Sequence, residues 1–173
     1  KLADAEKELA DGQKEYEDGL QTLDEKTADA KEEIADAQKR MANEEILERI
    51  RSSRAVSVHI RRGDYLQPEN AAMFGNICTE KYYESALNYM KEKIEDPHFF
   101  IFSDDVAYVR EHYQGEEYTI VDINHGDDSF YDMYLMSRCE GNICANSTFS
   151  FWGARLNPSP DKVMILSLIH ISE

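Results

Sequence analysis

Residues 56–65 have the sequence V-S-V-H-I-R-R-G-D-Y, which predicts a short buried strand running directly into two arginines. Apolar β-branched residues alternate with polar ones over residues 56–60, a pattern typical of a strand. Gly63 then predicts a turn, so Arg61 and Arg62 are expected at the carboxyl end of the strand, where open α/β sheets bind ligands. Two adjacent guanidiniums repel each other, and their planar forks fit phosphate oxygens. Either a bound anion or nearby carboxylates would explain the pair.

Strand and helix signals alternate through the rest of the chain. Apolar runs predict further strands at residues 98–102, 118–121, 142–145 and 163–165, and helical periodicity predicts helices at 79–94, 106–113, 129–136 and 147–156. Residues 66–78 show no clear periodicity and predict a long functional loop. This alternation predicts an α/β fold, a Rossmann-like parallel sheet with right-handed crossovers.

Polar clusters follow the predicted strands and are therefore expected at one edge of the sheet. They are Arg61-Arg62, Asp104-Asp105, Asp122 and Asn146-Ser147-Thr148. Arginines, hydroxyls and a helix N-terminus suit a nucleoside diphosphate, and Asp105 could accept a hydrogen bond from a base N–H. The alternatives are helix capping by Asp104, Asp105, Ser147 and Thr148, or metal binding by the two aspartates. No glycine-rich dinucleotide or P-loop motif is present in the sequence.

Residues 1–41 differ from the rest, because they repeat every seven residues. Small and apolar residues step by three and four, with one 4-4 step after Tyr16. This pattern predicts a coiled-coil helix with one stutter, either self-associating or solvated as a single helix. A second short helix is expected over residues 43–50. The seam comprises Leu2, Ala5, Leu9, Gly12, Tyr16, Leu20, Leu23, Thr27, Ala30, Ile34, Ala37 and Met41.

Composition limits the classes of partner. The 173 residues suffice for one core-bearing domain plus an extension, and the net charge of −16 argues against nucleic acid or an anionic membrane surface. Cys78, Cys139 and Cys144 fit no metal-ligand spacing, and the latter two are expected to be buried in a reducing compartment. No apolar run approaches 18 residues and no signal peptide is evident, so we expect no membrane span in this segment. The expected location is the cytoplasm, free or peripheral to the inner membrane.

Four sequence blocks resemble bacterial α-1,2-fucosyltransferases over residues 41–165. They are H-I-R-R-G-D-Y at 59–65, F-S-D-D at 102–105, D-M-Y-L-M-S-R-C at 132–139 and I-C-A-N-S-T-F-S-F-W-G-A-R-L at 143–156. The resemblance implies one lobe of a GT-B glycosyltransferase with GDP-β-L-fucose as donor. It also implies transfer with inversion to the 2-hydroxyl of a galactose-terminated glycan, a galactoside 2-alpha-L-fucosyltransferase activity that requires no metal or other cofactor.

The resemblance also implies roles for individual residues. Arg61 and Arg62 would bind the donor diphosphate, and the nucleotide would contact His59, Asp104 or Asp105, Asn146, Ser147, Thr148 and the N–H of Phe149. The catalytic base does not follow from the resemblance. Asp64, within the first block, and Glu69, in the following loop, are the two candidates, because an inverting displacement needs a group that accepts the acceptor proton.

Both ends of the chain depart from that family pattern. The family carries an N-terminal lobe with much of the acceptor site, whereas residues 1–41 resemble the extracytoplasmic coils of bacterial permease-like proteins. Residues 166–173, L-S-L-I-H-I-S-E, look like a translated sequencing adaptor. We therefore expect a coil at 1–41, a GDP-fucose-binding lobe at 42–165 and a non-native tail at 166–173, in a chimeric chain of little activity. The alternatives are a non-catalytic coiled-coil interaction protein and a metal-dependent nucleotide-sugar transferase.

Overall fold

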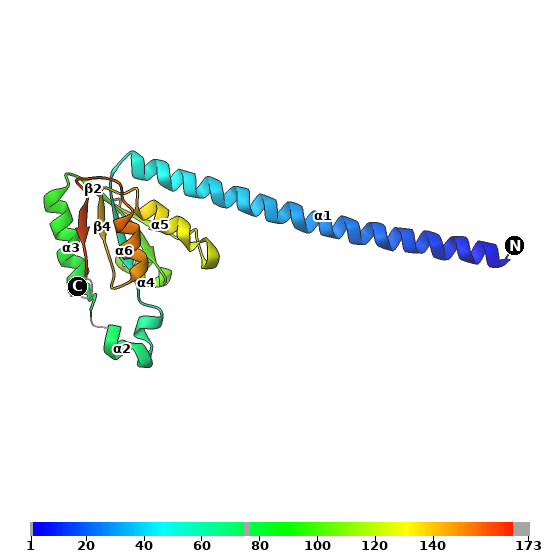
Figure 1. Cartoon of the computed structure of the whole chain (residues 1–173), viewed down its shortest axis with the longest axis horizontal. Coiled ribbons are helices and arrows are strands. Elements are labelled where there is room, and N and C mark those ends of the chain that lie inside the picture. Colours follow the sequence, from blue (N-terminus) through cyan, green and yellow to red (C-terminus); the bar gives the residue numbers. More distant parts are fainter. Residues whose placement is uncertain (1, 75–76, 168–173) are drawn as a thin grey trace. The chain divides into compact units, whose positions relative to one another are not determined.

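The computed structural model describes residues 2–74 and 77–167 and divides the chain into two compact units between Met41 and Ala42 (Figure 1). The first unit is a single helix, the greater part of α1 (Leu2–Arg51). Its predicted helical state is confirmed, whereas its pairing as a coiled coil stays a prediction. The helix expected over residues 43–50 is the last part of α1, which continues to Arg51. No glycine or proline lies between residues 20 and 51 to interrupt it.

The second unit is built on a five-stranded parallel sheet, which confirms the predicted Rossmann-like α/β fold. The strands lie in the order β3-β2-β1-β4-β5, with β1 in the centre. Val58 is opposite Ile101 on one side and Ile143 on the other. The chain reverses its direction of strand addition at β1, so a crevice is expected between the carboxyl ends of β1 and β4. The bounds are β1 (Arg54–Ile60), β2 (Pro97–Ser103), β3 (Tyr118–Val121), β4 (Gly141–Ile143) and β5 (Val163–Ile165).

Helices cover both faces of this sheet. The first face carries α3 (Glu80–Lys93) and α4 (Val106–His112), whose buried side chains include Met90 and Val109. The second face carries α5 (Phe130–Met136), α6 (Thr148–Arg155) and the last turns of α1, where Leu47 and Ile50 are buried. Figure 1 shows α3 on one side of the strands and α5 and α6 on the other.

Successive side chains of β1 point to opposite faces of the sheet and pack in two separate apolar clusters. Val56, Val58 and Ile60 are fully buried against α3, whereas Ala55 packs in the cluster with α1 and α5. Burying each large apolar side chain contributes about 1.5–3 kcal/mol, so each face gains most of its stability from such contacts. A strand buried on both faces is expected in a parallel sheet with helical crossovers on each side.

The segment after β1 differs from the expectation of an unstructured loop at residues 66–78. It forms a 3-10 turn, η1 (Asp64–Leu66), and a short helix, α2 (Pro68–Phe74). Pro68 occupies the first helical position, where a missing N–H costs nothing, and Asn70 donates through Nδ2 to the backbone oxygen of Asp64 at 3.1 Å. A second 3-10 turn, η2 (Gly126–Ser129), leads into α5. Among the described residues, no helix is both long and apolar enough to cross a bilayer.

Candidate functional site

A cavity of about 550 Å³ lies at the carboxyl ends of the strands. It is lined by the ends of three neighbouring strands and the segments after them, together with the start of α6. Of the polar residues predicted to meet at this edge, Arg61, Asp104, Ser147 and Thr148 line this cavity, whereas Arg62, Asp105, Asp122 and Asn146 do not. The lining residues are His59, Arg61, Asp64, Tyr65, Phe102, Ser103, Asp104, Asn124, His125, Gly126, Ser129, Asp132, Ser147, Thr148 and Phe149.

The two arginines lie in different places. Side chains alternate between the faces of a strand, and this alternation continues past the end of β1. Arg61 follows the direction of His59 into the 550 Å³ cavity, whereas Arg62 follows Ile60 to a separate cavity of about 330 Å³ beside Tyr108. The expectation that both guanidiniums share one cavity with Ser147 is therefore wrong for Arg62.

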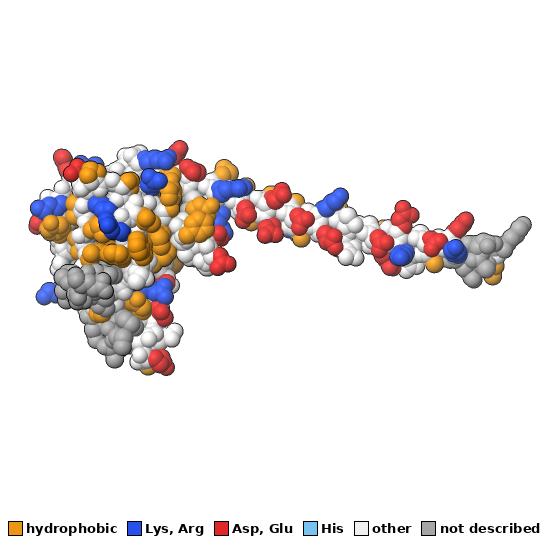
Figure 2. All heavy atoms as spheres, viewed as in Figure 1, with side chains coloured by type: hydrophobic (Ala, Val, Ile, Leu, Met, Phe, Trp, Pro, Cys, Tyr) orange, Lys and Arg blue, Asp and Glu red, His pale blue; other side chains and the backbone are white. Residues whose placement is uncertain are grey.

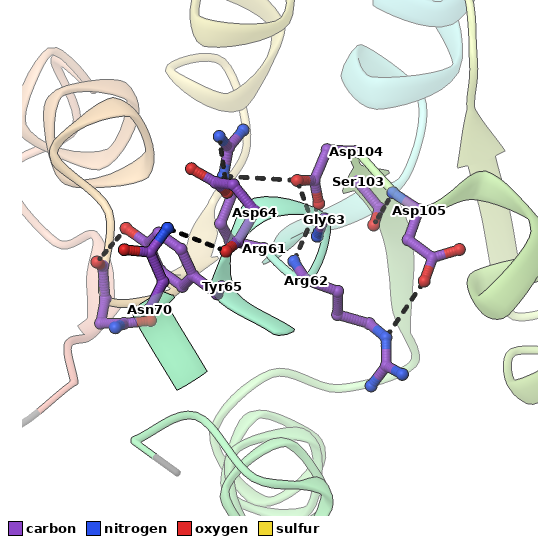
Figure 3. Close-up of polar contacts among 10 residues, drawn as sticks. Arg61, Arg62, Gly63, Asp64, Tyr65, Asn70, Ser103, Asp104 and Asp105 are labelled. Carbon is purple, nitrogen blue, oxygen red and sulfur yellow. Dashed lines mark hydrogen bonds and ion pairs between the residues drawn. The ribbon is translucent and has the colours of Figure 1, made fainter. Parts of the chain in front are cut away.

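Arg61 is held by two carboxylates, as Figure 3 shows. Its Nε and Nη2 lie 3.0 and 2.9 Å from Oδ1 of Asp64, and its Nε lies 3.3 Å from Oδ2 of Asp104. The side chain of Arg61 is about one third exposed and lines the cavity. Arg61 thus matches the predicted alternative of an arginine bridged to nearby carboxylates.

Asp104 fixes the backbone after β1. Its Oδ1 accepts from the N–H of Arg62 at 2.9 Å and its Oδ2 accepts from the N–H of Gly63 at 3.0 Å. The backbone at Gly63 lies close to the Asp104 carboxylate, because a Cβ added at Gly63 would lie 2.6 Å from Oδ2 of Asp104. The carboxylate of Asp104 therefore contacts both the guanidinium of Arg61 and the backbone turn after β1, and so positions Arg61.

Asp105 lies outside the cavity that contains Arg61. Its Oδ1 accepts from the N–H of Tyr108 at 3.1 Å, which caps α4, and its Oδ2 lies 3.2 Å from Nε of Arg62. The guanidinium of Arg62 stacks 3.5 Å from the ring centre of Tyr108. The capping alternative is confirmed for Asp105, and Figure 3 shows Arg62 extending away from Arg61 toward this residue.

His59 is a buried residue with an unused hydrogen-bonding atom. Its side chain is 6% exposed overall, and its Nδ1 has no partner within the described part of the chain. Burial lowers the pKa of His59 to about 3, with a further contribution from the charge of Arg61, so the ring is neutral near pH 7. The ring lies 5.6 Å from that of Phe149. Since buried polar atoms are nearly always bonded, the free nitrogen indicates a ligand.

The N-terminus of α6 faces the same cavity and is open. Ser147 occupies the N-cap position, yet its side chain makes no capping bond, so the capping alternative for Ser147 is wrong. Thr148 is exposed and Phe149 is half-buried. Asn146 is buried behind them, with Nδ2 unpaired among the described residues and its backbone oxygen accepting from the hydroxyl of Tyr65 at 3.1 Å. The first N–H groups of this helix lack intrahelical acceptors and carry its positive dipole end.

Residues 13–168 match glycosyl transferase family 11. The chain belongs to this family. Its match to family 11 begins inside α1, ahead of the sequence blocks quoted above. The expectation of a chimeric chain stays a prediction.

Curated relatives match between 61 and 66% of this chain. The alpha-1,2-colitosyltransferase of Escherichia coli is 40% identical over 116 residues, covering 65% of this chain and 40% of the relative. The O-antigen biosynthesis glycosyltransferase WbnK of Escherichia coli is 37% identical over 115 residues, covering 66% and 38%. The galactoside alpha-(1,2)-fucosyltransferase 2 of Bos taurus is 30% identical over 108 residues, covering 61% and 31%. The chain thus spans about two fifths or less of the length of these family 11 relatives.

The two candidate bases in this family 11 chain are placed differently. Asp64 lines the cavity beside Arg61. Glu69 is exposed in the first turn of α2 and is not one of the residues that line the cavity. The roles of both residues stay predictions.

Asp132 and Asn124 also line the cavity, although neither was predicted as a site residue. Burial raises the pKa of Asp132 to about 6, although a hydrogen bond from Nδ2 of Asn124 at 2.7 Å opposes the shift. Asn124 and Asn43 exchange reciprocal side-chain hydrogen bonds of 2.8 Å. Asp132 could have been noticed from the sequence, because it is the acidic residue that begins the largely apolar block at 132–139. No signal in the sequence relates Asn43 to Asn124, because the pair forms only once α1 packs on the sheet.

Proposed function

We propose that residues 42–165 bind the donor GDP-β-L-fucose as one lobe of a GT-B α-1,2-fucosyltransferase, with the diphosphate between Arg61 and the start of α6. The observation that carries this proposal is the shared cavity. It contains a partly exposed arginine, an uncapped helix N-terminus and a buried histidine nitrogen that has no partner among the described residues.

The phosphate oxygens would find two kinds of donor. The fork of Arg61 suits bidentate contact, and an entering diphosphate would compete with Asp64 for it. The hydroxyls of Ser147 and Thr148, with the free N–H groups of α6, add uncharged donors and a positive dipole end. A chain with a net charge of −16 needs such a local site to attract a dianion.

The nucleobase would lie toward His59 and Asp132. The neutral ring of His59 offers its unpaired Nδ1, and the carboxylate of Asp132 can accept hydrogen bonds from base N–H groups. The acid predicted for this contact was Asp104 or Asp105. Asp132 suits it better, because the carboxylate of Asp104 is bonded to two backbone N–H groups and that of Asp105 caps α4.

The proposed reaction breaks the bond between the fucose anomeric carbon and the diphosphate oxygen. The 2-hydroxyl of a galactose acceptor attacks that carbon from the opposite side, giving inversion, and its proton passes to a carboxylate. Asp64 is the better placed of the two candidate bases because it lines the cavity. Arg61 and the N–H groups of α6 would stabilise the charge that develops on the departing diphosphate.

A metal-dependent reaction through Asp104 and Asp105 is the less favoured candidate. The carboxylate of Asp104 is bonded to two backbone N–H groups, and that of Asp105 caps α4. Among the described residues, no group of three or more His, Cys, Asp or Glu side chains is arranged to hold an ion. We therefore propose that donor binding requires no metal cofactor.

Titration calorimetry of the full chain with GDP and with GDP-fucose tests the proposal. Arg61→Ala is expected to weaken binding about 10–100-fold, since charge-assisted hydrogen bonds contribute about 1.5–3 kcal/mol. Arg62→Ala is the matched control, and it should change affinity less than about 3-fold because Arg62 lies in the other cavity. Equal losses in the two variants would overturn the placement of the diphosphate.

Two further arms separate the alternatives. Binding that disappears in chelator would favour the metal-dependent transferase over the present proposal. Absence of any nucleotide binding by the folded chain would favour the non-catalytic coiled-coil interaction protein. Comparing GDP-fucose with GDP-colitose then tests the sugar, since one relative is named a colitosyltransferase.

A further inference from the structure

Among the described residues of the first unit, the large apolar side chains in the seam of α1 are exposed. Tyr16, Leu20, Leu23, Ile34 and Met41 are 67, 43, 60, 58 and 73% exposed. Figure 2 shows charged side chains along the visible side of this helix, with apolar side chains between them. Helices gain most of their stability from packing an apolar face, so a second helix against this seam would stabilise residues 16–41. A second copy of the same chain carries a matching seam.

Side-chain size favours an antiparallel arrangement of two copies. In a parallel pair each seam residue faces itself, so Ala30 and Ala37 would face alanines and leave gaps. In an antiparallel pair centred between Ala28 and Asp29, large residues face large ones or fill the space beside small ones. The facing pairs are Leu23 with Ile34, Leu20 with Ala37, Thr27 with Ala30, and Tyr16 with Met41.

Thr27 is suited to such a seam. Its hydroxyl donates to the backbone oxygen of Leu23 at 2.7 Å, so the polar atom is already bonded within its own helix. The methyl group can then pack against Ala30 of the second copy without an unpaired hydroxyl.

Charge favours the same arrangement. The residues flanking the seam are Lys26 and Glu33 on one side and Asp24 and Lys31 on the other, all exposed. In a parallel pair Lys26 would face Lys31 of the second copy, which is repulsive. In the antiparallel pair Lys26 faces Glu33 of the second copy and Asp24 faces Lys31 of the second copy. The two-fold symmetry repeats both attractive contacts, and flanking charges of this kind set helix orientation.

We propose that residues 16–41 form an antiparallel coiled-coil dimer with a second copy of the chain. The proposal is independent of the nucleotide site. It goes beyond the self-association predicted from the seven-residue repeat, because it commits to the partner, the orientation and the register.

Sedimentation equilibrium of the full-length chain tests the orientation by charge reversal. Lys26→Glu places glutamates opposite each other in the antiparallel dimer and should weaken it about 10-fold. Glu33→Lys should weaken it similarly, and the double variant should restore wild-type affinity. Lys14→Glu is the matched control, because it makes the same charge change outside the overlap, and it should change affinity less than about 2-fold. In a parallel dimer Lys26→Glu would instead strengthen association by facing Lys31.

Disulfide trapping provides a readout that does not depend on affinity. Mixing full-length Thr27→Cys with Ala30→Cys under mild oxidation should give the 27–30 linkage between two chains, identified by mass spectrometry. A dominant linkage of Thr27→Cys to itself would overturn the antiparallel arrangement. A chain that stays monomeric at about 100 μM, well above the Kd expected of a stable dimer, would overturn the dimer itself.

Discussion

The two faces of β1 carry different chemistry, although they belong to one strand. On the first face Val56, Val58 and Ile60 are fully buried, and Arg62 beyond them is paired with Asp105 and stacked on Tyr108. On the second face His59 has a buried nitrogen without a partner among the described residues, and Arg61 lines the larger cavity.

The helices on these faces differ in the same way. On the first face the N-terminus of α3 is capped by the hydroxyl of Thr79 and that of α4 by the carboxylate of Asp105. On the second face α6 has no side-chain cap at Ser147. A face whose polar groups are satisfied internally contributes stability, whereas unsatisfied groups around a cavity indicate a place for a ligand. Two adjacent arginines on one strand can therefore have different roles.

The largest expected effect compares two buried methionines on opposite faces. Met90 of α3 is fully buried on the first face, and Met136 of α5 is 2% exposed on the second. Met90→Ala should lower the free energy of unfolding by about 2–5 kcal/mol, because it leaves a cavity, while GDP affinity of the folded protein stays unchanged. Urea unfolding and calorimetry measure the two quantities.

Met136→Ala is the counterpart, with the same chemical change. Met136 packs closely against Gly153 of α6. A Cβ added at Gly153 would lie 3.1 Å from the side chain of Met136. A similar loss of stability is expected, accompanied by weaker GDP binding because α5 and α6 line the cavity. Unchanged GDP affinity in Met136→Ala, or weakened affinity in Met90→Ala, would contradict the division between the faces.

The second prediction uses two titrating groups on the cavity face. The pKa of His59 is lowered to about 3 from 6.5, so His59 makes stability fall as pH drops below about 6.5. The pKa of Asp132 is raised to about 6 from 3.8, so Asp132 makes stability rise as pH drops from about 6 to 4. The two slopes oppose each other between pH 6 and pH 4, each at about 1.4 kcal/mol per pH unit.

Substitution separates these slopes. Relative to wild type, Asp132→Asn should lose about 1.4 kcal/mol of unfolding free energy for each unit that pH falls between 6 and 4. His59→Gln should gain a similar amount over the same range. Urea unfolding at pH 4, 5, 6 and 7 measures both, and Asp161→Asn, an exposed carboxyl, serves as the control. Parallel pH profiles for wild type and both variants would refute the two shifts.

Most of the fold follows from local patterns, whereas the details of the site depend on tertiary contacts. Each strand and each helix of eight or more residues has a periodic or capping signal, as at Thr79. The separation of Arg61 from Arg62 follows from strand alternation, yet the phosphate interpretation of an arginine pair obscured it. The bond between Asn43 and Asn124 joins residues 81 positions apart, and no local pattern indicates it. Asp132 required the burial that only the packed helices supply.

The smallest expected effect compares two helix N-termini. Thr79 accepts a capping bond from the N–H of Tyr82 at 3.4 Å, whereas Ser147 makes no such bond. Thr79→Ala should therefore lower the free energy of unfolding by about 1 kcal/mol with GDP affinity unchanged. Ser147→Ala should change unfolding by less than about 0.5 kcal/mol but weaken GDP binding about 3–10-fold, because its hydroxyl makes no capping bond and Ser147 lines the cavity. If Ser147→Ala were the more destabilising of the two and left GDP binding intact, the hydroxyl would be structural. The open end of α6 would then lose its proposed role.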